Sequence, residues 1–446
     1  ATPVLTTTGW KQHGDLVAGD YVFAPDGLPV RVTAVLPVLL SEPAWEIQFS
    51  DGELIVCGER HEWPILSNCE WVKCGGSRRG GKGVRHRHLE LREARDLPGQ
   101  RGARCHGSQL TAPIQHPERS LPIGPYLLGC WLGDGTSACA NITVGEQDKE
   151  HFAGLGEVFP VRGRPGIYRI RVPGLFRDLR LRGLLNNKHV PDEYMLGSVR
   201  QRLALVQGLL DTDGCCSKEG QVSLTTIYHH IADSLMRLLW SLGLRPRIAE
   251  RRAKLYGRDC GPIWTVNFSP PEGFQAFRLK RTQARVDAVR RCRYGNMRFI
   301  RSARPVESVP MRCISVEGGL YLAGHSLVAT HNSTTASLYG AAWYLSLLPE
   351  HRILFATTTA NSAGAWGQRV RDLVSEHGAS VGVAVEGRRM RQDWTTNHGG
   401  GMRSIGGGSP AGLGAHLQIM DDTVADAKSA LSSSAQQDLW NWYLAD

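Results

Sequence analysis

The sequence lacks the features that mark membrane, secreted and zinc-cluster proteins. Its 446 residues contain no apolar run near the roughly 20 residues of a membrane helix, and no secretory signal pattern. The eleven cysteines are scattered, which favours reduced thiols over a disulfide framework. Cys69, Cys74 and Cys105 lack the paired spacing of a zinc site. We therefore expect a cytoplasmic protein of roughly two to four domains.

Acidic residues are scarce in the first three quarters of the chain. The net charge is +10, yet residues 333–446 hold 8 Lys and Arg against 10 Asp and Glu. Residues 1–332 therefore carry +12. A solvated basic surface explains this simply, whereas the sharper hypothesis is a polyanionic partner, most commonly nucleic acid.

The pattern of apolar residues changes along the chain. Residues 1–66 read as short alternating strands, with hairpin signals at Asp26-Gly27 and Asp51-Gly52. Residues 115–255 read as apolar helices and Arg-rich strands, and short strands return from about Pro305. After Ser333 a helical period precedes the apolar strand RILFATTT, which is typical of an α/β domain. The sequence thus predicts an all-β module that is split by an insertion and ends at Asn332.

The segment Thr330-His331-Asn332-Ser333 can carry backbone-cleavage chemistry. The amide of Asn332 can attack its own carbonyl, closing a succinimide and releasing the downstream segment. His331 can polarise that carbonyl or protonate the departing amine, and the Ser333 hydroxyl can hold an acyl group as an ester. The alternative is an ordinary turn with a helix-capping serine.

Together with these residues, the outer segments resemble an intein, a self-splicing protein insert. GDLVAGDYVFAPDG (14–27) resembles the first intein block, and His61 stands where inteins keep the histidine that strains and protonates the N-terminal scissile amide. His331 and Asn332 match the last block, with Ser333 as the first downstream residue. The resemblance implies a closed all-β horseshoe, the Hint fold, with both ends side by side.

Two departures indicate a subclass. Ala1 offers no nucleophile where inteins usually begin with Cys or Ser, and Cys313 stands where an Asp is usual. Class 3 inteins share this pattern and carry a Trp-Cys-Thr triplet, which Trp63, Cys313 and Thr330 match. The plain alternative makes them a core residue, a buried thiol and a strand residue.

The resemblance implies a reaction without Ala1 as nucleophile. The Cys313 thiolate attacks the carbonyl before Ala1, and Ser333 accepts the acyl group. Asn332 then cyclises with help from His331. All these groups must lie within a few ångströms of one another. With Ala1 as the first residue there is no upstream bond to attack, so we expect at most cleavage after Asn332.

Two further positions depart from the intein pattern. Gly58 stands where many inteins keep Thr, and Leu322 where many keep His. We expect both differences to weaken the acid–base assistance to splicing.

The insertion contains one motif twice, LLGCWLGDG (127–135) and VQGLLDTDG (206–214). Both copies resemble the LAGLIDADG motif of homing endonucleases, in which small residues let two helices pack closely. The resemblance implies that Asp134 and Asp213 share a Mg²⁺ site over double-stranded DNA. It also places Lys188 near the scissile phosphate. Leu132 replaces the usual acid at the sixth position of the first copy.

Basic strands should supply the contacts to DNA. Arginines recur in the predicted strand segments 161–172 and 244–252, where they would track the phosphate backbone.

The segment after Ser333 resembles an ATPase domain. LQIMDD (417–422) reads as a buried strand that ends in two acids. It resembles a Walker B motif, in which Asp421 holds Mg²⁺ and Asp422 orients the attacking water. No GxxxxGK precedes Ser333, so the insertion would interrupt that motif and Ser333 would become the Mg²⁺ ligand beside ATP. Residues 333–446 resemble the partial P-loop ATPase of a phage terminase large subunit, which implies a small subunit and a portal as partners. A replicative helicase is the alternative host.

These resemblances predict a multidomain chain in a bacterial cytoplasm. The expected parts are splicing segments 1–110 and 285–332, an α+β endonuclease over 115–270, and the ATPase part over 333–446. Two other functions remain open: an autoprocessing module that cleaves only at Asn332, and a DNA-binding nuclease with inert β-flanks.

Overall fold

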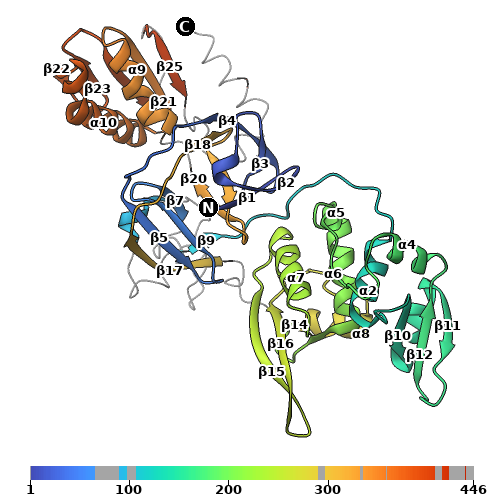
Figure 1. Cartoon of the computed structure of the whole chain (residues 1–446). Coiled ribbons are helices and arrows are strands. Elements are labelled where there is room, and N and C mark those ends of the chain that lie inside the picture. Colours follow the sequence, from blue (N-terminus) through green and yellow to red (C-terminus); the bar gives the residue numbers. More distant parts are fainter. Residues whose placement is uncertain are drawn as a thin grey trace. The chain divides into compact units, whose positions relative to one another are not determined.

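The computed structural model of the chain describes residues 2–65, 90–97, 107–289, 297–331, 335–357, 359–406, 414–420 and 437 (Figure 1). Contacts divide the chain into two compact units. The first unit comprises residues 1–32, 37–312 and 320–330, and the second comprises 33–36, 313–319 and 331–446. Every helix in the described ranges is too short or too polar to span a lipid bilayer.

Short antiparallel strands form the β-module of the first unit, as predicted. These strands are β1 (Pro3–Thr6), β2 (Gly9–Gln12), β3 (Tyr21–Phe23), β4 (Pro29–Val35), β5 (Ala44–Phe49), β6 (Leu54–Gly58), β7 (Glu62–Ile65), β8 (Glu90–Glu93), β9 (Gly107–Gln109), β17 (Met297–Val306), β19 (Leu320–Ala323) and β20 (Val328–His331). Two single-turn 3₁₀ helices, η1 (His13–Asp15) and η3 (Ala94–Asp96), accompany them. The hairpin turns at Asp26-Gly27 and Asp51-Gly52 are confirmed, since they join β3 to β4 and β5 to β6. Gly27 and Gly52 have φ of 82° and 97°, which glycine adopts at little cost.

The split of the β-module is also confirmed. Strand β17 pairs antiparallel with β5 and with β9, in a sheet ordered β6-β5-β17-β9. Ala303 on β17 lies opposite Ile47 on β5, although more than 250 residues separate them in sequence. The chain therefore leaves this sheet, builds the insertion, and returns to complete it.

The insertion is an internal duplication around one hydrophobic core (Figure 1). Its first half contains α2 (Pro125–Asp134), β10 (Asn141–Gly145), η5 (Glu146–Asp148), α3 (Lys149–Phe152), η6 (Ala153–Leu155), β11 (Glu157–Pro160), β12 (Ile167–Arg171), α4 (Leu175–Leu181) and α5 (Asp192–Met195). Its second half contains α6 (Val199–Asp213), β13 (Gly214–Cys216), β14 (Val222–Thr226), α7 (His229–Ser241), β15 (Arg247–Leu255), β16 (Arg258–Phe268) and α8 (Lys280–Asp287). In each half a helix ending in Asp is followed by one or two strands, a helix, a hairpin and a further helix.

The two halves also share a sheet topology. The strand orders are β10-β12-β11 and β13-β14-β16-β15, and the residue after each motif aspartate bridges the next long strand. Gly135 pairs with Ile142, and Gly214 pairs with Leu224. The shared core runs as far as Val286, beyond the predicted domain end at residue 270.

The second unit contains an α/β domain, as predicted for the part after Ser333. Its elements are η8 (Thr335–Gly340, a π-helical turn), α9 (Ala341–Leu347), β21 (Arg352–Thr357), α10 (Ala360–His377), η9 (Gly378–Val381), β22 (Val385–Arg389), β23 (Asp393–Thr396), β24 (Gly401–Gly406) and β25 (Leu417–Met420). The sheet order is β22-β23-β24-β21-β25, and β21 is parallel to both of its neighbours. Strand β21 is buried as expected. LQIM does form a strand, but the expectation that it is buried is wrong, because β25 lies at the sheet edge and leaves Met420 48% exposed.

Candidate splicing and endonuclease sites

Three residues of the predicted splicing site lie together in the first unit. His61 precedes β7, Trp63 lies within it, and Thr330 lies on β20. The His61 Nε2 and Thr330 Oγ1 atoms are hydrogen-bonded across 269 positions of sequence. The His61 ring meets the Trp63 ring edge-on, with centroids 5.1 Å apart. The fold therefore joins the histidine to two members of the triplet.

Trp63 is a buried core residue whose indole nitrogen is unpaired. It is 1% exposed and packs against Phe49, with ring centroids 5.4 Å apart. Its indole Nε1 is buried and has no hydrogen-bond partner among the described residues. An unpaired buried donor costs about 1–3 kcal/mol, so the packing of the ring must offset this cost.

A polar clamp, which sequence reasoning missed, fixes the turn before β20. The Glu53 carboxylate accepts hydrogen bonds from the backbone amides of His325 (3.1 Å) and Ser326 (2.9 Å). Arg298 donates to the Ser326 carbonyl at 2.5 Å and forms a fully buried ion pair with Asp51 at 2.6 Å. The turn leads directly to Thr330. The Asp51-Gly52-Glu53 hairpin signal was visible in the sequence, but its distant partner was not.

The structure also describes two other residues of the predicted splicing site. Cys313 directly precedes β18 (Ile314–Val316) in the second unit, where its carbonyl accepts a hydrogen bond from the Leu36 amide at 2.9 Å. Cys313 is partly exposed. His331 ends β20 and belongs to the same unit. Ala1, Asn332 and Ser333 lie outside the described residues, as do Asp421, Asp422 and the cysteines at 69, 74 and 105.

Both positions that depart from the intein pattern are described. Leu322 is 1% exposed and lies in the apolar core, so it offers no acid–base group there. Gly58 ends β6, and a Cβ on it would make ordinary contact with Glu42.

Helices α2 and α6 pack backbone to backbone, which confirms the reason for the small residues in the motif. A Cβ on Gly208 would lie 2.2 Å from the Tyr126 carbonyl oxygen and 2.8 Å from the Cys130 amide nitrogen. A Cβ on Gly129 would lie 2.3 Å from the Leu205 carbonyl oxygen. Only glycine therefore fits at this crossing.

The crossing brings Asp134 and Asp213 into one electrostatic site, since each is the last residue of its helix. Partial burial, and next the charge of Asp213, raise the pKa of Asp134 to about 6 against the effect of Lys188. Burial also raises the pKa of Asp213, again opposed by Lys188. A divalent cation suits two such carboxylates. No group of three or more acidic, His or Cys side chains suited to a metal occurs in the described part of the chain.

Lys188 lies beside these carboxylates and also caps a helix. It is 8% exposed and donates to the Leu132 and Gly133 carbonyls at 2.9 and 2.8 Å. These carbonyls belong to the last turn of α2, where unpaired acceptors and the helix dipole favour a cation. Burial lowers the pKa of Lys188, whereas the two aspartates raise it.

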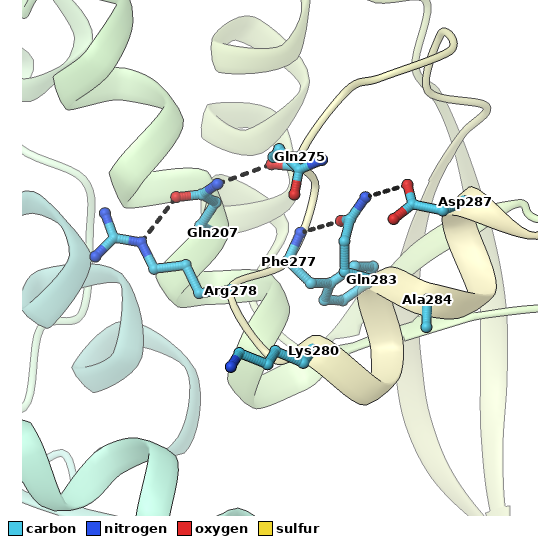
Figure 2. Close-up of a pocket in the computed structure, with 8 residues that line it drawn as sticks. All are labelled: Gln207, Gln275, Phe277, Arg278, Lys280, Gln283, Ala284 and Asp287. Carbon is cyan, nitrogen blue, oxygen red and sulfur yellow. Dashed lines mark hydrogen bonds between the residues drawn. The ribbon is translucent and has the colours of Figure 1, made fainter.

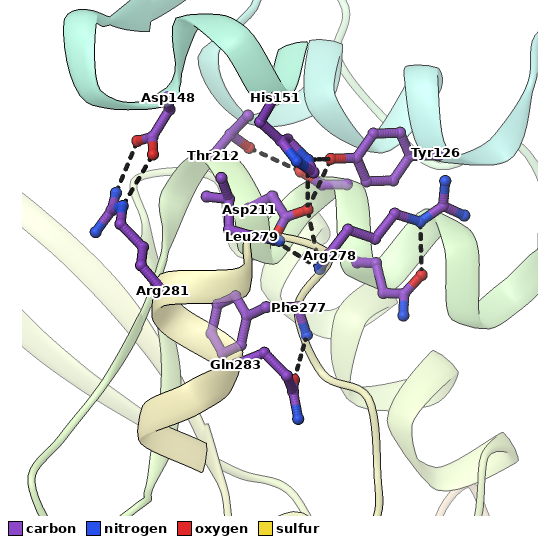
Figure 3. A network of polar contacts seen from close by, with 12 residues as sticks. Tyr126, Asp148, His151, Asp211, Thr212, Phe277, Arg278, Leu279, Arg281 and Gln283 are labelled. Carbon is purple, nitrogen blue, oxygen red and sulfur yellow. Dashed lines mark hydrogen bonds and ion pairs between the residues drawn. The ribbon is translucent and has the colours of Figure 1, made fainter. Parts of the chain in front are cut away.

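The residues at the sixth position of the two motif copies, Leu132 and Asp211, have different surroundings. Leu132 lies in the core, whereas its counterpart Asp211 is a buried acceptor for the Tyr126 hydroxyl at 2.7 Å (Figure 3). Asp211 also accepts from the backbone amides of Arg278 (3.1 Å) and Leu279 (3.2 Å). One acid thus ties the first half to the segment before α8. This role was not visible in the motif.

A second polar contact crosses between the halves. Arg281 on α8 forms a bidentate ion pair with Asp148, with N–O distances of 2.7 and 2.9 Å (Figure 3).

An open pocket of about 570 Å³ lies between α6, the segment before α8, and α8 itself (Figure 2). Gln207 spans one wall, since it accepts from Arg278 Nε at 2.9 Å and donates to the Gln275 carbonyl at 2.8 Å. None of the predicted site residues lines this pocket.

Both sheets of the insertion present polar residues on the face opposite the core. Arg169 and Arg171 on β12 alternate with Ile170, which is completely buried. On β15, Arg247 and Arg251 lie opposite Asn267 and Ile263 of β16, whereas the buried Val266 lies opposite Ile248. Arg-rich strands at the predicted positions are therefore confirmed.

Comparison with known proteins finds a family model and two curated relatives that match this chain. Residues 200–279 match the family model of a LAGLIDADG-like domain. A replicative DNA helicase DnaB of Mycobacterium intracellulare is 31% identical over 415 residues, covering 88% of this chain and 67% of the relative. Another, from Mycobacterium leprae (strain TN), is 42% identical over 77 residues, covering 17% of this chain and 13% of the relative.

Two solved structures are also similar to this chain. They are the MchDnaB-1 intein (18% identity, TM-score 0.24) and the Msm DnaB1 intein splicing domain bound with zinc (15%, 0.25). Each match covers 74% of this chain and 96% of the other.

The class of protein is now defined by a LAGLIDADG-like domain over residues 200–279, within the insertion. The chain belongs to the family of the replicative DNA helicase DnaB. A match over 88% of the chain cannot be contained in residues 1–332, so it bears on the host protein as well. It contradicts the predicted terminase host, together with its small-subunit and portal partners, and supports the helicase alternative.

Proposed function

We propose that residues 1–332 splice by the class 3 route, with Cys313 as the first nucleophile. The Cys313 thiolate forms a thioester with the carbonyl before Ala1, and the Ala1 amine leaves with a proton from His61. Ser333 Oγ then takes the acyl group and frees the thiol. Asn332 closes its succinimide and releases the Ser333 amine, which receives the acyl group in a final shift from oxygen to nitrogen.

The contact between His61 and Thr330 carries this proposal. It joins the residue that must protonate the N-terminal junction to the strand that leads into the C-terminal junction. A hydrogen bond from the threonine hydroxyl would hold the imidazole in one tautomer and orientation, as a general acid requires.

The test uses a precursor that restores an upstream flank ending in GxxxxGK, with the ligated flanks measured by mass. Cys313→Ala should abolish branch formation, and Asn332→Ala should stop release of the downstream segment. Cys57→Ala, which removes a buried strand thiol, is the matched control and should still ligate. Ligation that survives Cys313→Ala contradicts the proposal. Cleavage after Asn332 with no ligated product favours the autoprocessing module instead.

We further propose that the insertion cuts double-stranded DNA with Mg²⁺ held by Asp134 and Asp213. The backbone contact of Gly129 with Gly208 supports this, because it brings both helix ends together. The bound cation would supply Lewis-acid chemistry at a phosphodiester. Lys188 would offer a positive charge to the same phosphate, and the basic sheet faces would hold the duplex.

Cleavage of the uninterrupted host gene is the matching test. Asp134→Asn and Asp213→Asn should each reduce cutting by at least about 100-fold, since each removes a metal ligand. Glu219→Gln changes an exposed turn carboxylate and should cut normally. If both aspartate variants cleave the DNA at the rate of Glu219→Gln, the proposal is contradicted.

For the downstream segment we propose an ATP-driven helicase host. Ser333 and Asp421 would hold Mg²⁺, and Asp422 would orient the attacking water. The parallel pairing of β21 with β24 and β25 supports this, since P-loop ATPases use such a sheet. ATP hydrolysis by the ligated host, lost in Asp422→Asn, is the test.

A further inference from the structure

The β15–β16 hairpin continues well beyond the sheet to which it belongs. The last pair between β14 and β16 is Thr226 with Trp264. From Arg251 onward, β15 pairs only with β16, as far as Leu255 opposite Arg258. At about 3.3 Å per residue, this free two-stranded arm is roughly 17 Å long. Figure 1 shows it projecting from the insertion.

The tip of this arm is apolar, aromatic and strained. Tyr256 is 100% exposed and Leu255 is 61% exposed. Tyr256 also has a φ of 49°, in the left-handed region that bulky residues rarely occupy. Asparagine or glycine would form this turn at lower cost. A strained, fully exposed tyrosine adds nothing to the stability of the arm, which indicates a surface kept for a partner.

The sides of the arm are basic. Arg251, Arg252, Lys254 and Arg258 lie on its two strands, and all are exposed. Arg252 is paired with Asp259 at 2.7 Å, which leaves three cations in excess over the acids of the arm. Basic sides with an aromatic tip fit nucleic acid, because phosphates attract the cations and bases accept the ring.

The first half of the insertion has no such arm. Strand β12 is the counterpart of β16, and all five of its residues pair with β10. The β11–β12 hairpin therefore ends where its sheet ends. The two halves therefore differ in reach, although they share a topology.

We propose that the β15–β16 arm binds duplex DNA beyond the edge of the sheet and places Tyr256 against a base step there. This rests on the endonuclease function proposed above. An arm of roughly 17 Å spans about five base pairs at about 3.4 Å each. The target is then asymmetric, with its longer side under the second half, and Tyr256 acts as a wedge with Leu255 beside it.

The test uses the full chain and its mapped cleavage site, with the DNA flanks shortened one base pair at a time. The wild type should need about five more base pairs on one side of the cut than on the other. Tyr256→Asn suits the left-handed backbone but removes the ring, so it should weaken binding about 5- to 150-fold and abolish the extra requirement. Tyr256→Phe keeps the ring and should bind as the wild type does. 2-Aminopurine at the contacted step should brighten with wild type and Phe but not with Asn.

The outcomes separate the arm from the nuclease. If Asp134→Asn stops cleavage while Tyr256→Asn keeps the wild-type affinity and flank requirement, the arm proposal is overturned and the endonuclease proposal stands. Equal flank requirements on both sides of the wild-type cut also overturn it. Should the wild type bind no duplex at all, both proposals fall. Loss of self-association in Tyr256→Asn, with DNA binding unchanged, identifies a second copy as the occupant instead. Thermal melting should show Tyr256→Asn folded as the wild type.

Discussion

Substitution of Gly208 by alanine tests whether the helix crossing sets the cleavage geometry. The new Cβ would lie 2.2 Å from the Tyr126 carbonyl oxygen, 2.8 Å from the Cys130 nitrogen and 3.0 Å from the Gly129 Cα. These are backbone atoms, which cannot move away by a change of rotamer as a side chain can. Since relaxed contacts need about 3.5 Å, α2 and α6 must separate by roughly 1 Å.

Two measurable effects are expected from this separation. Overpacking of this kind costs about 1–3 kcal/mol, which urea unfolding would show. The helix ends carry Asp134 and Asp213, and a displacement of about 1 Å in a catalytic constellation costs on the order of 100-fold in rate. Single-turnover cleavage of the target should therefore slow by about that factor, while ligation of the flanks proceeds normally.

Gly145→Ala is the matched control. Gly145 ends β10 in the first half of the insertion, its φ is −82°, and nothing lies within 4 Å of an added Cβ. Its variant should cut and unfold like the wild type. Cleavage at the wild-type rate by Gly208→Ala would refute the argument that close backbone contact positions the carboxylates.

Three further predictions concern buried charge. Arg298→Ala leaves Asp51 buried without its partner, so unfolding in urea should show a loss of about 3–5 kcal/mol, against less than about 1 kcal/mol for Arg304→Ala in an exposed pair with Glu46. Because the pKa of Asp134 is raised to about 6, Mg²⁺-dependent cleavage should fall as the pH drops below about 6, and a flat rate down to pH 5 contradicts this. A raised carboxyl pKa means that the folded state binds the proton more tightly, so stability falls as pH rises from about 4 through 6. Asp134→Asn should therefore melt higher than wild type at pH 7 and equally at pH 4, and no difference at pH 7 refutes it.

Local signals in the sequence predicted much of the fold. The two Asp-Gly turns fix hairpins because glycine supplies the positive φ that the turn needs. The repeated motif predicted a helix crossing because it resembles the LAGLIDADG motif, in which small residues let two helices pack closely. Such signals act over a few residues, so a single sequence suffices to recognise them.

Contacts between distant segments escaped prediction. The ion pair of Arg298 and Asp51 joins strand β17 to the turn between β5 and β6, and nothing local marks these residues, 247 positions apart, as partners. The motif resemblance predicts Lys188 as a site residue, but its bonds to the last carbonyls of α2 depend on the fold alone. The burial of β25 was misjudged because an apolar run does not reveal whether a strand is central or at an edge. Likewise, the host was misjudged because a strand ending in two acids is common to many P-loop ATPases.

The duplication of the insertion within one chain has a consequence for inheritance. In a homodimer one gene encodes both DNA-reading surfaces, so every substitution changes both halves of the recognised site together. Here Leu132 and Asp211 already differ at equivalent positions, and the equivalent strands β12 and β16 differ in length. Each half can accordingly accumulate substitutions separately. The DNA sequence recognised by one half can then change while the sequence recognised by the other half stays the same.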